Sequence, residues 1–589
     1  MKFAIIITLC LYLLINSAII REPSIQYYSF KTQKHITHLS MYKERHSYII
    51  TNSTPKNTIA EVTYINDIET FGWGKLNVHT YNKSDEYTQS YCAGYLEGIV
   101  TYQEISNFYY NLYNNYHKES KLIDKIIAFL ELVSKELLSK LSQITKDTSF
   151  YEYQLYLSFQ QLVGLYHGYN SMSKDNKLSI GKLLLIQSDS EIPELLNYFK
   201  YHKKELIQLG DKNYFKRAFG LKSNNPNKAW IKLISHSRCS AFIKLVTDNQ
   251  NRVTDLLSGH TTWSSYSELI RIYKHYSFNN NTTSLIFSSY PGVLTSTDDF
   301  IISKNKLVIM ETTIEVIDIN LYKQMKLEYK NYVPNFMRVL LASKNAKNNK
   351  EWITLFRKNM SGTYSSQWMI LDYKIFNKIK GKTLNKVKQY KNLFQLTEEI
   401  PNKIISHDIS NVLYNKKYFG SYNRAFLNSS KKTLNQQLIE HLYGNKFSYN
   451  DGNRALIFKH FNRKIRTLKQ MNDLLRYNGY KGNNDWKEDP SKKSPSKGIS
   501  ARFDLEKGYL YELSGGVDTK VTNSSLVNQM GSVVVLGPTQ GNINQLKAFT
   551  WRKNKDKVYH KGVPKKLSFP HLMMSPHTIN GKSQKYVFK

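Results

Sequence analysis

The chain has 589 residues, of which 41% are hydrophobic and 13% aromatic. This composition supplies the apolar material of a large core and excludes a globally disordered chain. The formal net charge of +37 at pH 7 favours an acidic partner such as nucleic acid or anionic lipid. Because the lysines are spread over the chain, without a long basic run or a nucleic-acid-binding motif, we predict no nucleic-acid partner.

The N-terminus is typical of a secretory signal peptide. One lysine precedes an apolar run at residues 3–15, and the small residues Ser17 and Ala18 follow. The run falls short of the roughly 20 residues that a membrane-spanning helix needs, so we predict a signal peptide at residues 1–18 with cleavage near Ala18. N-x-S/T sequons, the acceptors of N-glycosylation, begin at Asn52, Asn82, Asn280, Asn281, Asn359, Asn428 and Asn523. We therefore expect the secretory pathway, with a lysosomal, phagosomal or extracellular destination left open.

Helical patterns dominate the part of the chain before Cys239. Residues 71–78 indicate a turn that leads into a strand, and the small and aromatic residues 89–98 indicate a helix packed closely against a sheet. Apolar residues recur every three or four positions in 121–141, which predicts an amphipathic helix. Residues 153–169 form a second helical candidate.

Strand patterns alternate with helices from Cys239 onward. After Cys239, apolar and other side chains alternate as far as residue 246, which predicts a strand with Cys239 as its first residue. Further strands are expected at 285–290, 300–302, 306–314, 368–373 and 533–536, and the first three of these are expected to form an antiparallel meander. Together these patterns favour an α+β fold.

Cys239 is the candidate nucleophile. From its spacing alone, a small buried hydrophobe and a nucleophile at the lip of a core strand remain open. Cleavage of the preceding peptide bond would give this thiol its own base, the new α-amine. Cys92 lies among alanine and glycine and is interpreted as core filler, so no disulfide framework is expected. No HExxH or CxxC motif occurs, and we predict neither a metal site nor a cofactor.

Ten short motifs, in order along the chain, resemble the phospholipase B-like proteins, also called lamina ancestor homologues, of the N-terminal nucleophile hydrolase superfamily. They are GWGKL (72–76), AGYLEG (93–98), CSAFIK (239–244), HTTW (260–263), SSYPG (288–292), ETTI (311–314), SGTY with QWM (361–364 and 367–369), SYN (421–423), ISAR (499–502) and GGVDTK (515–520).

The resemblance implies one large domain with an αββα sandwich, made as a precursor and cut autocatalytically between Arg238 and Cys239. A helix-rich fragment, 19–238, and a strand-rich fragment, 239–589, would stay associated. The implied reaction is the removal of fatty acyl chains from glycerophospholipids.

Six residues match the family's site positions. The resemblance makes Cys239 the nucleophile and Asn423 a catalytic residue, which we expect to donate a hydrogen bond to the oxyanion. His260, Trp263, Thr313 and Arg454 match positions that line the pocket and bind substrate. The planar guanidinium of Arg454 is suited to stabilising a thiolate or binding a phosphate.

Two alternatives remain open on the sequence. The same nucleophile chemistry would serve an N-acyl amide hydrolase, and a catalytically silent lipid-binding glycoprotein would retain the fold without the reaction. The excess of lysine is also compatible with docking on anionic, peripheral membrane surfaces. The oligomeric state is not predicted.

Overall fold

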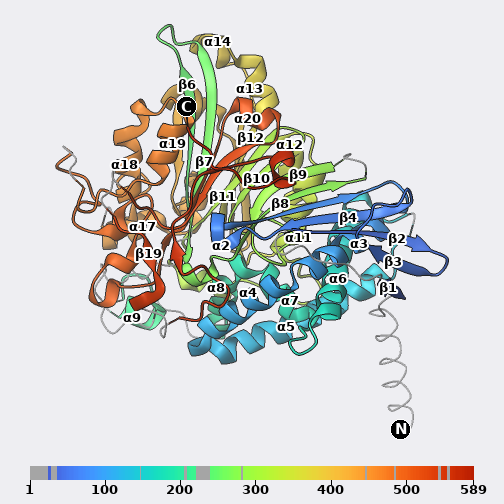
Figure 1. Ribbon diagram of the computed structural model, residues 1–589. Coiled ribbons are helices and arrows are strands. Elements are labelled where there is room, and N and C mark those ends of the chain that lie inside the picture. The colour runs from blue at the N-terminus through green and yellow to red at the C-terminus, as the bar shows by residue number, and fades with distance from the viewer. Residues whose placement is uncertain are drawn as a thin grey trace.

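The computed structural model describes residues 24–27, 36–145, 147–203, 208–211, 213–219, 239–279, 283–444, 447–482, 486–541, 546–553 and 558–588. Within these residues the fold is a mixed α+β structure with two large sheets (Figure 1). None of the described helices is both long and apolar enough to cross a bilayer.

The larger sheet has twelve strands in the described part of the chain. Both the region before Cys239 and the region after it contribute, because β5 pairs in parallel with β8. The spatial order is β1 (Ile25–Tyr27), β3 (Ser47–Thr51), β2 (Ile36–Glu44), β4 (Thr58–Ile65), β5 (Trp73–Thr80), β8 (Arg271–Phe278), β9 (Thr283–Ser289), β10 (Phe300–Ser303), β11 (Leu307–Thr313), β12 (Ser366–Asp372), β13 (Phe394–Ile400) and β14 (Lys403–Asp408).

The smaller sheet contains the strand that carries Cys239. Its order is β15 (Tyr418–Ser421), β6 (Cys239–Thr247), β7 (Val253–Ser265), β17 (Asp518–Thr522), β18 (Ser532–Leu536) and β21 (Leu572–Met574), with β16 (Ser514–Gly516) added to β7. A separate pair is formed by β19 (Phe549–Thr550) and β20 (Lys566–Leu567).

The two sheets face each other, and side chains join them across the interface. The Ser258 hydroxyl on β7 lies 2.7 Å from that of Tyr373, which follows β12. The hydroxyls of Thr312 on β11 and Ser421 on β15 are 2.5 Å apart. These contacts fix the position of one sheet relative to the other, and Cys239 lies between the two sheets.

Helices cover the outer face of each sheet (Figure 1). The larger sheet is covered by α3 (Glu86–Val100), α11 (Asn335–Asn345) and α12 (Asn349–Phe356), and the smaller by α18 (Asn453–Phe461) and α19 (Leu468–Leu475). Beyond α3 lie α4 (Tyr102–Asn115), α5 (Ser120–Leu141), α6 (Phe150–Met172), α7 (Ile180–Gln187) and α8 (Ile192–Tyr201). The shorter helices are α2 (Ile68–Phe71), α9 (Tyr214–Phe219), α13 (Tyr373–Ile379), α14 (Leu384–Val387), α15 (Ser410–Lys416), α16 (Asn428–Thr433), α17 (Gln436–Tyr443), α20 (Ser524–Asn528) and α21 (Pro576–Ile579).

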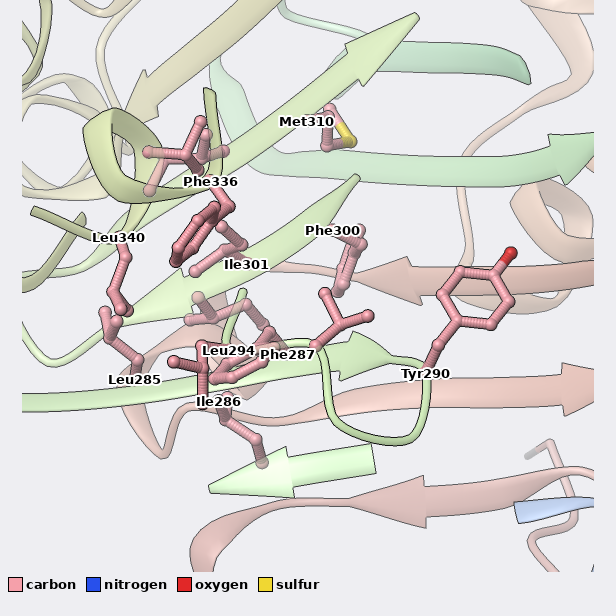
Figure 2. Packing of buried hydrophobic residues seen from close by; sticks show 14 of the residues in the cluster. Leu285, Ile286, Phe287, Tyr290, Leu294, Phe300, Ile301, Met310, Phe336 and Leu340 are labelled. Carbon is pink, nitrogen blue, oxygen red and sulfur yellow. The ribbon is translucent and has the colours of Figure 1, made fainter. Parts of the chain in front are cut away.

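The elements expected from hydrophobic periodicity are present, and four strands before Cys239 are additional. The two predicted helices correspond to α5 and α6, and the predicted meander to β9, β10 and β11. Figure 2 shows how α11 closes this part of the core, with Phe336 and Leu340 against the side chains of β9 and β10. Four strands within residues 25–65, β1 to β4, extend the larger sheet, so the region before Cys239 is not only helical.

Helices α3 and α6 cross at a contact between glycines and backbone. A Cβ atom at Gly164 on α6 would lie 2.1 Å from the Tyr91 carbonyl oxygen, and one at Gly94 on α3 would lie 1.9 Å from that of Gln161. No heavy atom of a real side chain is tolerated at such a distance. The small residues predicted to pack a helix closely at 89–98 therefore bring two helix backbones together.

Gly164→Ala is expected to destabilise the protein by about 3 kcal/mol, the upper part of the range for overpacked cores, because α3 and α6 must separate. In an unconstrained helix the same change stabilises by roughly 1 kcal/mol. The sign of the change in stability therefore shows whether the two helix backbones are in contact at Gly164. The measurement is Tm at a fixed scan rate. The matched control is Gly581→Ala, whose added Cβ would meet nothing closer than 4.0 Å. An unchanged Tm for Gly164→Ala would contradict this contact.

A buried carboxyl on α8 makes the stability depend on pH. Glu194 Oε1 accepts a hydrogen bond of 3.0 Å from the backbone N–H of Ser365. Burial raises the pKa of Glu194 from 4.5 to about 8, and the charges of Glu399 and Glu191 add to the effect. Between pH 4.5 and about 8, Glu194 is therefore neutral in the folded protein but ionised in the unfolded chain.

The contribution of Glu194 to stability is fully present below pH 4.5 and is lost as pH rises to about 8, because unfolding then releases a proton. Glu194→Gln keeps an oxygen for Ser365 and cannot ionise. We expect wild type to lose more unfolding free energy than Glu194→Gln between these two pH values, measured by urea denaturation. The exposed Glu512→Gln should follow wild type, and parallel wild-type and Glu194→Gln curves would contradict the assignment.

Candidate functional site

Cys239 is the first residue of β6 and lies at the centre of the molecule. It pairs with Thr262 on β7, and its side chain has no solvent exposure. Side chains alternate between the two faces of a strand, so Cys239, Ala241, His260 and Thr262 share the face turned to the larger sheet. The described cysteines, Cys92 and Cys239, are both buried and free.

A carboxylate and an imidazole lie beside the thiol. The Sγ of Cys239 donates toward Asp299 Oδ2 over 3.9 Å, and the sulfur, a ring nitrogen of His260 and a carboxylate oxygen of Asp299 lie within 4.8 Å of one another. His260 Nε2 is 2.8 Å from the Glu311 carbonyl oxygen. A carbonyl can only accept, so Nε2 carries the proton. Burial and the nearby Lys520 hold the pKa of His260 well below 6.5, and the ring is neutral.

Asp299 belongs to a pair of buried carboxyls. The Tyr364 hydroxyl lies 2.6 Å from Glu311 Oε2 and 3.2 Å from Asp299 Oδ2. Burial, the charge of Asp299 and a hydrogen bond to it raise the pKa of Glu311 well above 4.5. A carboxyl whose pKa is raised by donating to its neighbour is the protonated member of the pair, so Glu311 carries the proton and Asp299 the charge.

The environment keeps the Cys239 thiol protonated. Burial raises its pKa well above 9.0, and the charge of Asp299 raises it further. Lys520 and a hydrogen bond from the Trp263 backbone N–H act in the opposite direction. The thiol therefore needs a proton acceptor before it can act as a nucleophile, because the thiolate is the reactive form.

Arg454, from α18, fixes the backbone around Cys239. One guanidinium nitrogen donates to the Cys239 carbonyl oxygen at 2.8 Å and to Ser240 Oγ at 2.9 Å. The other donates to Asn423 Oδ1 at 2.7 Å and to a backbone carbonyl at 2.9 Å. The guanidinium carbon lies 4.4 Å from the centre of the Trp263 ring. Arg454 thus joins β6, the segment after β15 and Trp263.

Asn423 and Thr313 lie next to each other at the ends of β15 and β11. The Asn423 side-chain N–H donates to the Thr313 carbonyl oxygen at 2.7 Å, and the backbone of Asn423 is left-handed, with φ of +68°. One of its two N–H bonds is therefore engaged in the intact chain. The buried Thr313 hydroxyl has no hydrogen-bond partner among the described residues, so it is available to a polar ligand.

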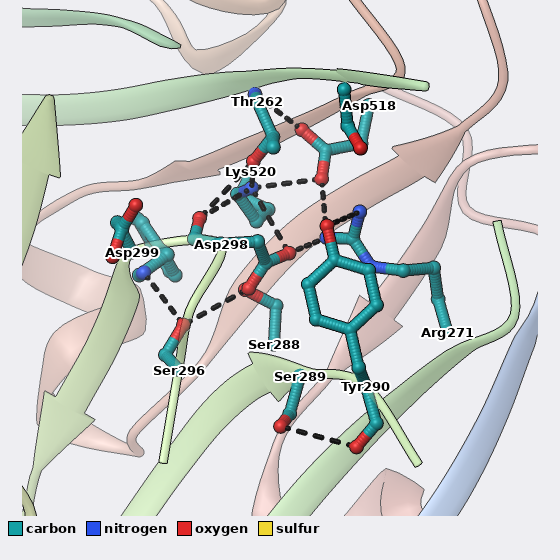
Figure 3. A network of polar contacts seen from close by, with 12 residues as sticks. Thr262, Arg271, Ser288, Ser289, Tyr290, Ser296, Asp298, Asp299, Asp518 and Lys520 are labelled. Carbon is teal, nitrogen blue, oxygen red and sulfur yellow. Dashed lines mark hydrogen bonds and ion pairs between the residues drawn. The ribbon is translucent and has the colours of Figure 1, made fainter. Parts of the chain in front are cut away.

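Four buried charged side chains form a network around Thr262, the strand partner of Cys239 (Figure 3). Arg271 pairs with Asp298 and with Asp518, the latter at 2.8 Å, and Lys520 Nζ is 2.8 Å from Asp518 and 3.4 Å from Asp298. All four side chains have no solvent exposure. Lys520 also donates to Thr262 Oγ1 at 2.7 Å. The network ties β7, β8 and β17 to the loop that carries Asp298 and Asp299.

Cys239, His260 and Asp299 are also the one group in the described residues that could hold a metal ion. Sulfur, nitrogen and oxygen ligands of this kind suit zinc. In the intact chain His260 Nε2 is used by the Glu311 carbonyl, and the thiol is protonated. The absence of a metal site thus stays a prediction from the sequence.

The structure brings the six predicted site residues together, although in two layers. Cys239 and His260 face the larger sheet, whereas Trp263, three positions after His260, lies on the other face of β7 against Arg454. Sequence reasoning assigned no role to the polar and charged residues near the thiol, which are Asp298, Asp299, Glu311, Tyr364, Arg271, Asp518 and Lys520. The paired acids at 298–299, directly before an apolar strand, were a signal for the first two.

The remaining predicted positions are distributed over the surface and outside the described residues. Arg238, Asn280 and Asn281 lie outside the described residues, as does the signal peptide at 1–18. Asn52, Asn82, Asn359 and Asn428 are exposed. Asn523 is half-buried, and its side-chain N–H donates to Asp255 at 3.0 Å. Glycosylation at these positions stays a prediction, and Asn523 is the acceptor with the least accessible amide.

Comparisons with known proteins place the chain in one family. The description of that family is Phospholipase B, and its profile matches residues 60–574. The chain is 30% identical over 550 residues to "Phospholipase B-like protein C" of Dictyostelium discoideum, covering 90% of this chain and 89% of the relative. It is also 30% identical over 540 residues to human "Phospholipase B-like 1", with the same coverage. "Putative phospholipase B-like 1" of Caenorhabditis elegans is 29% identical over 536 residues, 87% of this chain and 86% of the relative.

The chain belongs to the phospholipase B family. The match spans both sheets, from β4 to β21, and includes Cys239 and the residues around it. The names of these relatives suggest a lipid hydrolase.

Arg454→Lys is expected to lower the unfolding free energy by at least about 2 kcal/mol, because an ammonium cannot replace a planar fork that makes four hydrogen bonds. Tm at constant pH measures the loss. The control is Arg463→Lys, an exposed position near the end of the same helix, where Tm should stay at the wild-type value. Equal Tm values for both variants would show that Arg454 does not organise the site.

Proposed function

We propose that the protein removes fatty acyl chains from glycerophospholipids, with Cys239 as an N-terminal nucleophile. The observation that carries the proposal is the position of Cys239, the first residue of a central strand, with Asp299, His260 and Arg454 around its sulfur and backbone. Membership of the phospholipase B family supports the lipid substrate. The two facing sheets between helix layers support an αββα sandwich of the N-terminal nucleophile hydrolase type.

Self-cleavage before Cys239 must come first in this proposal. The Cys239 side chain has no exposure in the intact chain, so an acyl ester cannot reach its sulfur. Attack of the thiol on the Arg238 carbonyl, an N-to-S acyl shift and hydrolysis would free the α-amine of Cys239. The fragments 19–238 and 239–589 would stay associated, because β5 of the first pairs along its length with β8 of the second.

Turnover then follows from the chemistry of the new N-terminus. An unperturbed α-amine titrates at about 7.7–8.0, so it can take the thiol proton and return it to the leaving glycerol oxygen. The thiolate forms a thioester with the acyl chain, and water hydrolyses it. Asn423 has a second N–H for the oxyanion, a contribution of roughly 3–4 kcal/mol per donor. The unpartnered Thr313 hydroxyl is available to a polar ligand, and His260 lies beside the sulfur.

The proposed setting is the secretory pathway, with a lysosomal, phagosomal or extracellular end point. The exposed sequons at Asn52, Asn82, Asn359 and Asn428 are sterically available for glycans. The net charge of +37 supports docking on anionic membrane surfaces. No nucleic acid, metal or cofactor takes part in the proposed reaction.

Two other functions use the same features. An N-acyl amide hydrolase would keep the thiol chemistry and differ only in the leaving group, so assays of phosphatidylcholine and of an N-acyl amide on the processed protein separate the two. A silent lipid-binding glycoprotein would need no free amine. It would run as one full-length band on a denaturing gel, without a fragment that begins at Cys239.

Cys239→Ala is expected to stay uncut and to lose hydrolysis of phosphatidylcholine, because both steps use its sulfur. Denaturing gels, N-terminal sequencing of the fragments and fatty-acid release are the measurements. Cys92→Ala, which removes the other buried free thiol, should be cut and active.

Processing at residue 239 that survives Cys239→Ala requires another cleaving agent. Lipid turnover that survives it would exclude Cys239 as the nucleophile.

A further inference from the structure

The base of an N-terminal nucleophile is its own free α-amine, and this amine does not exist before self-cleavage. Before the chain is cut, the nitrogen of Cys239 is part of a peptide bond, and an amide nitrogen does not take up a proton at neutral pH. The thiol itself is protonated because burial and the charge of Asp299 oppose the thiolate. Another group in contact with the sulfur must accept the proton in the first step.

Asp299 has the required geometry. Its Oδ2 is the acceptor toward which Cys239 Sγ donates, at 3.9 Å, within the range of a sulfur hydrogen bond. Asp299 has no more than 2% exposure, and its backbone has φ of +66°, a left-handed conformation that only a few per cent of residues other than glycine adopt. Residues held in this way cluster at functional sites.

The buried charge network holds Asp299 in place. Its neighbour Asp298 is anchored by Arg271 and Lys520, and Asp298 Oδ1 accepts hydrogen bonds from Ser288 at 2.7 Å and Ser296 at 2.9 Å (Figure 3). The chain on the other side of Asp299 enters β10 directly. The carboxylate therefore cannot move away from the sulfur without disrupting these contacts.

The other groups that face the thiol are less suited to accept its proton. Glu311 already carries a proton, which it shares with Asp299. His260 donates through Nε2, which leaves Nδ1 as its only acceptor nitrogen, and burial and Lys520 hold the pKa of the ring well below 6.5, so it is a weak base. Lys520, Arg454 and Tyr364 are donors toward their neighbours in this site.

We propose that Asp299 is the general base of self-cleavage at Cys239, an inference that rests on the proposed function. The Cys239 S–H proton moves to Asp299 Oδ2 as the sulfur bonds to the carbonyl carbon that precedes Cys239. The C–N bond then breaks, and the proton on Asp299 passes to the leaving nitrogen, which becomes the free amine. Water adds to the thioester, its proton returns to the sulfur, and the new C-terminal carboxyl is released.

The same carboxylate has a role after cleavage. The new α-amine belongs to Cys239, the residue whose sulfur donates toward Asp299. An anion stabilises the protonated amine, which is the form that returns a proton to the leaving group. Asp299 would thus act first on the thiol and later on the amine that replaces it as base.

The test compares buried acids in the full-length chain. Wild type, Asp299→Asn, Asp299→Glu, Glu311→Gln and Asp372→Asn are made by cell-free synthesis, and the appearance of the fragment that begins at Cys239 is followed over time. Asp372 is a buried aspartate at the far end of β12 and serves as the matched control. Tm, compared with that of uncut Cys239→Ala, reports whether each variant is folded.

We expect Asp299→Asn to slow cleavage by at least ~100-fold, the low end of the effect of a general base. Asp299→Glu should cut measurably faster than Asp299→Asn, Glu311→Gln should lose less than about tenfold, and Asp372→Asn should match wild type. Folded Asp299→Asn that is cut at the wild-type rate overturns the inference, as does a greater loss in Glu311→Gln than in Asp299→Asn.

Two further results separate the possible failures. If wild type is not cut before Cys239, the proposed function itself fails, whereas normal cutting of Asp299→Asn with wild-type cleavage intact removes only the role of Asp299. If Asp299→Asn does not fold, the wild-type pH profile decides. Cleavage should slow on acidification, because a protonated Asp299 cannot accept the thiol proton, and a rate that does not fall with pH while the chain stays folded overturns the inference.

Discussion

The arrangement of the site depends on a buried network of two cations and two anions between the sheets. Arg271 and Lys520 meet Asp298 and Asp518 without solvent exposure, and Arg271 and Lys520 lower the pKa of Asp518. Removing one member of such a network typically costs about 3–5 kcal/mol, because its partner is left as an uncompensated buried charge. The network comes from β8, β17 and the loop before β10, so it fixes the register of the two sheets and the position of Asp299 beside the thiol.

The thiol is held in an environment that suppresses its reactivity until a proton acceptor acts. Burial and the Asp299–Glu311 pair raise the pKa of Cys239, while Lys520 and the Trp263 N–H oppose them. Arg454 meanwhile fixes the Cys239 carbonyl. Arg454 thus fixes the backbone of Cys239, whereas other groups decide whether its thiol keeps the proton. In the proposed function both effects serve first self-cleavage and then lipid turnover.

The regions that would become the two fragments already pack against each other in the intact chain. Strands β2 to β5 extend the sheet that β8 to β14 continue, and α3 and α6 meet at a backbone contact that admits only glycine. Strand β4 (TIAEVTYI) carries the alternation of a half-buried strand, so the sequence contained the signal that extends this sheet. The pairing of β5 with β8 was not readable, because parallel partners are chosen by contacts distant in the chain.

The sequence by itself determined the α+β class, the main helices, the strand that begins at Cys239 and the family, whereas the roles of the six site residues stay a prediction. Local periodicity and short motifs encode these features. Only the tertiary structure decided that Asp299, Glu311 and Tyr364 surround the sulfur and that Trp263 lies behind Arg454. These residues are up to 215 positions from Cys239 in the chain, and their proximity arises from sheet packing and buried charge pairing, which no local pattern of residues specifies.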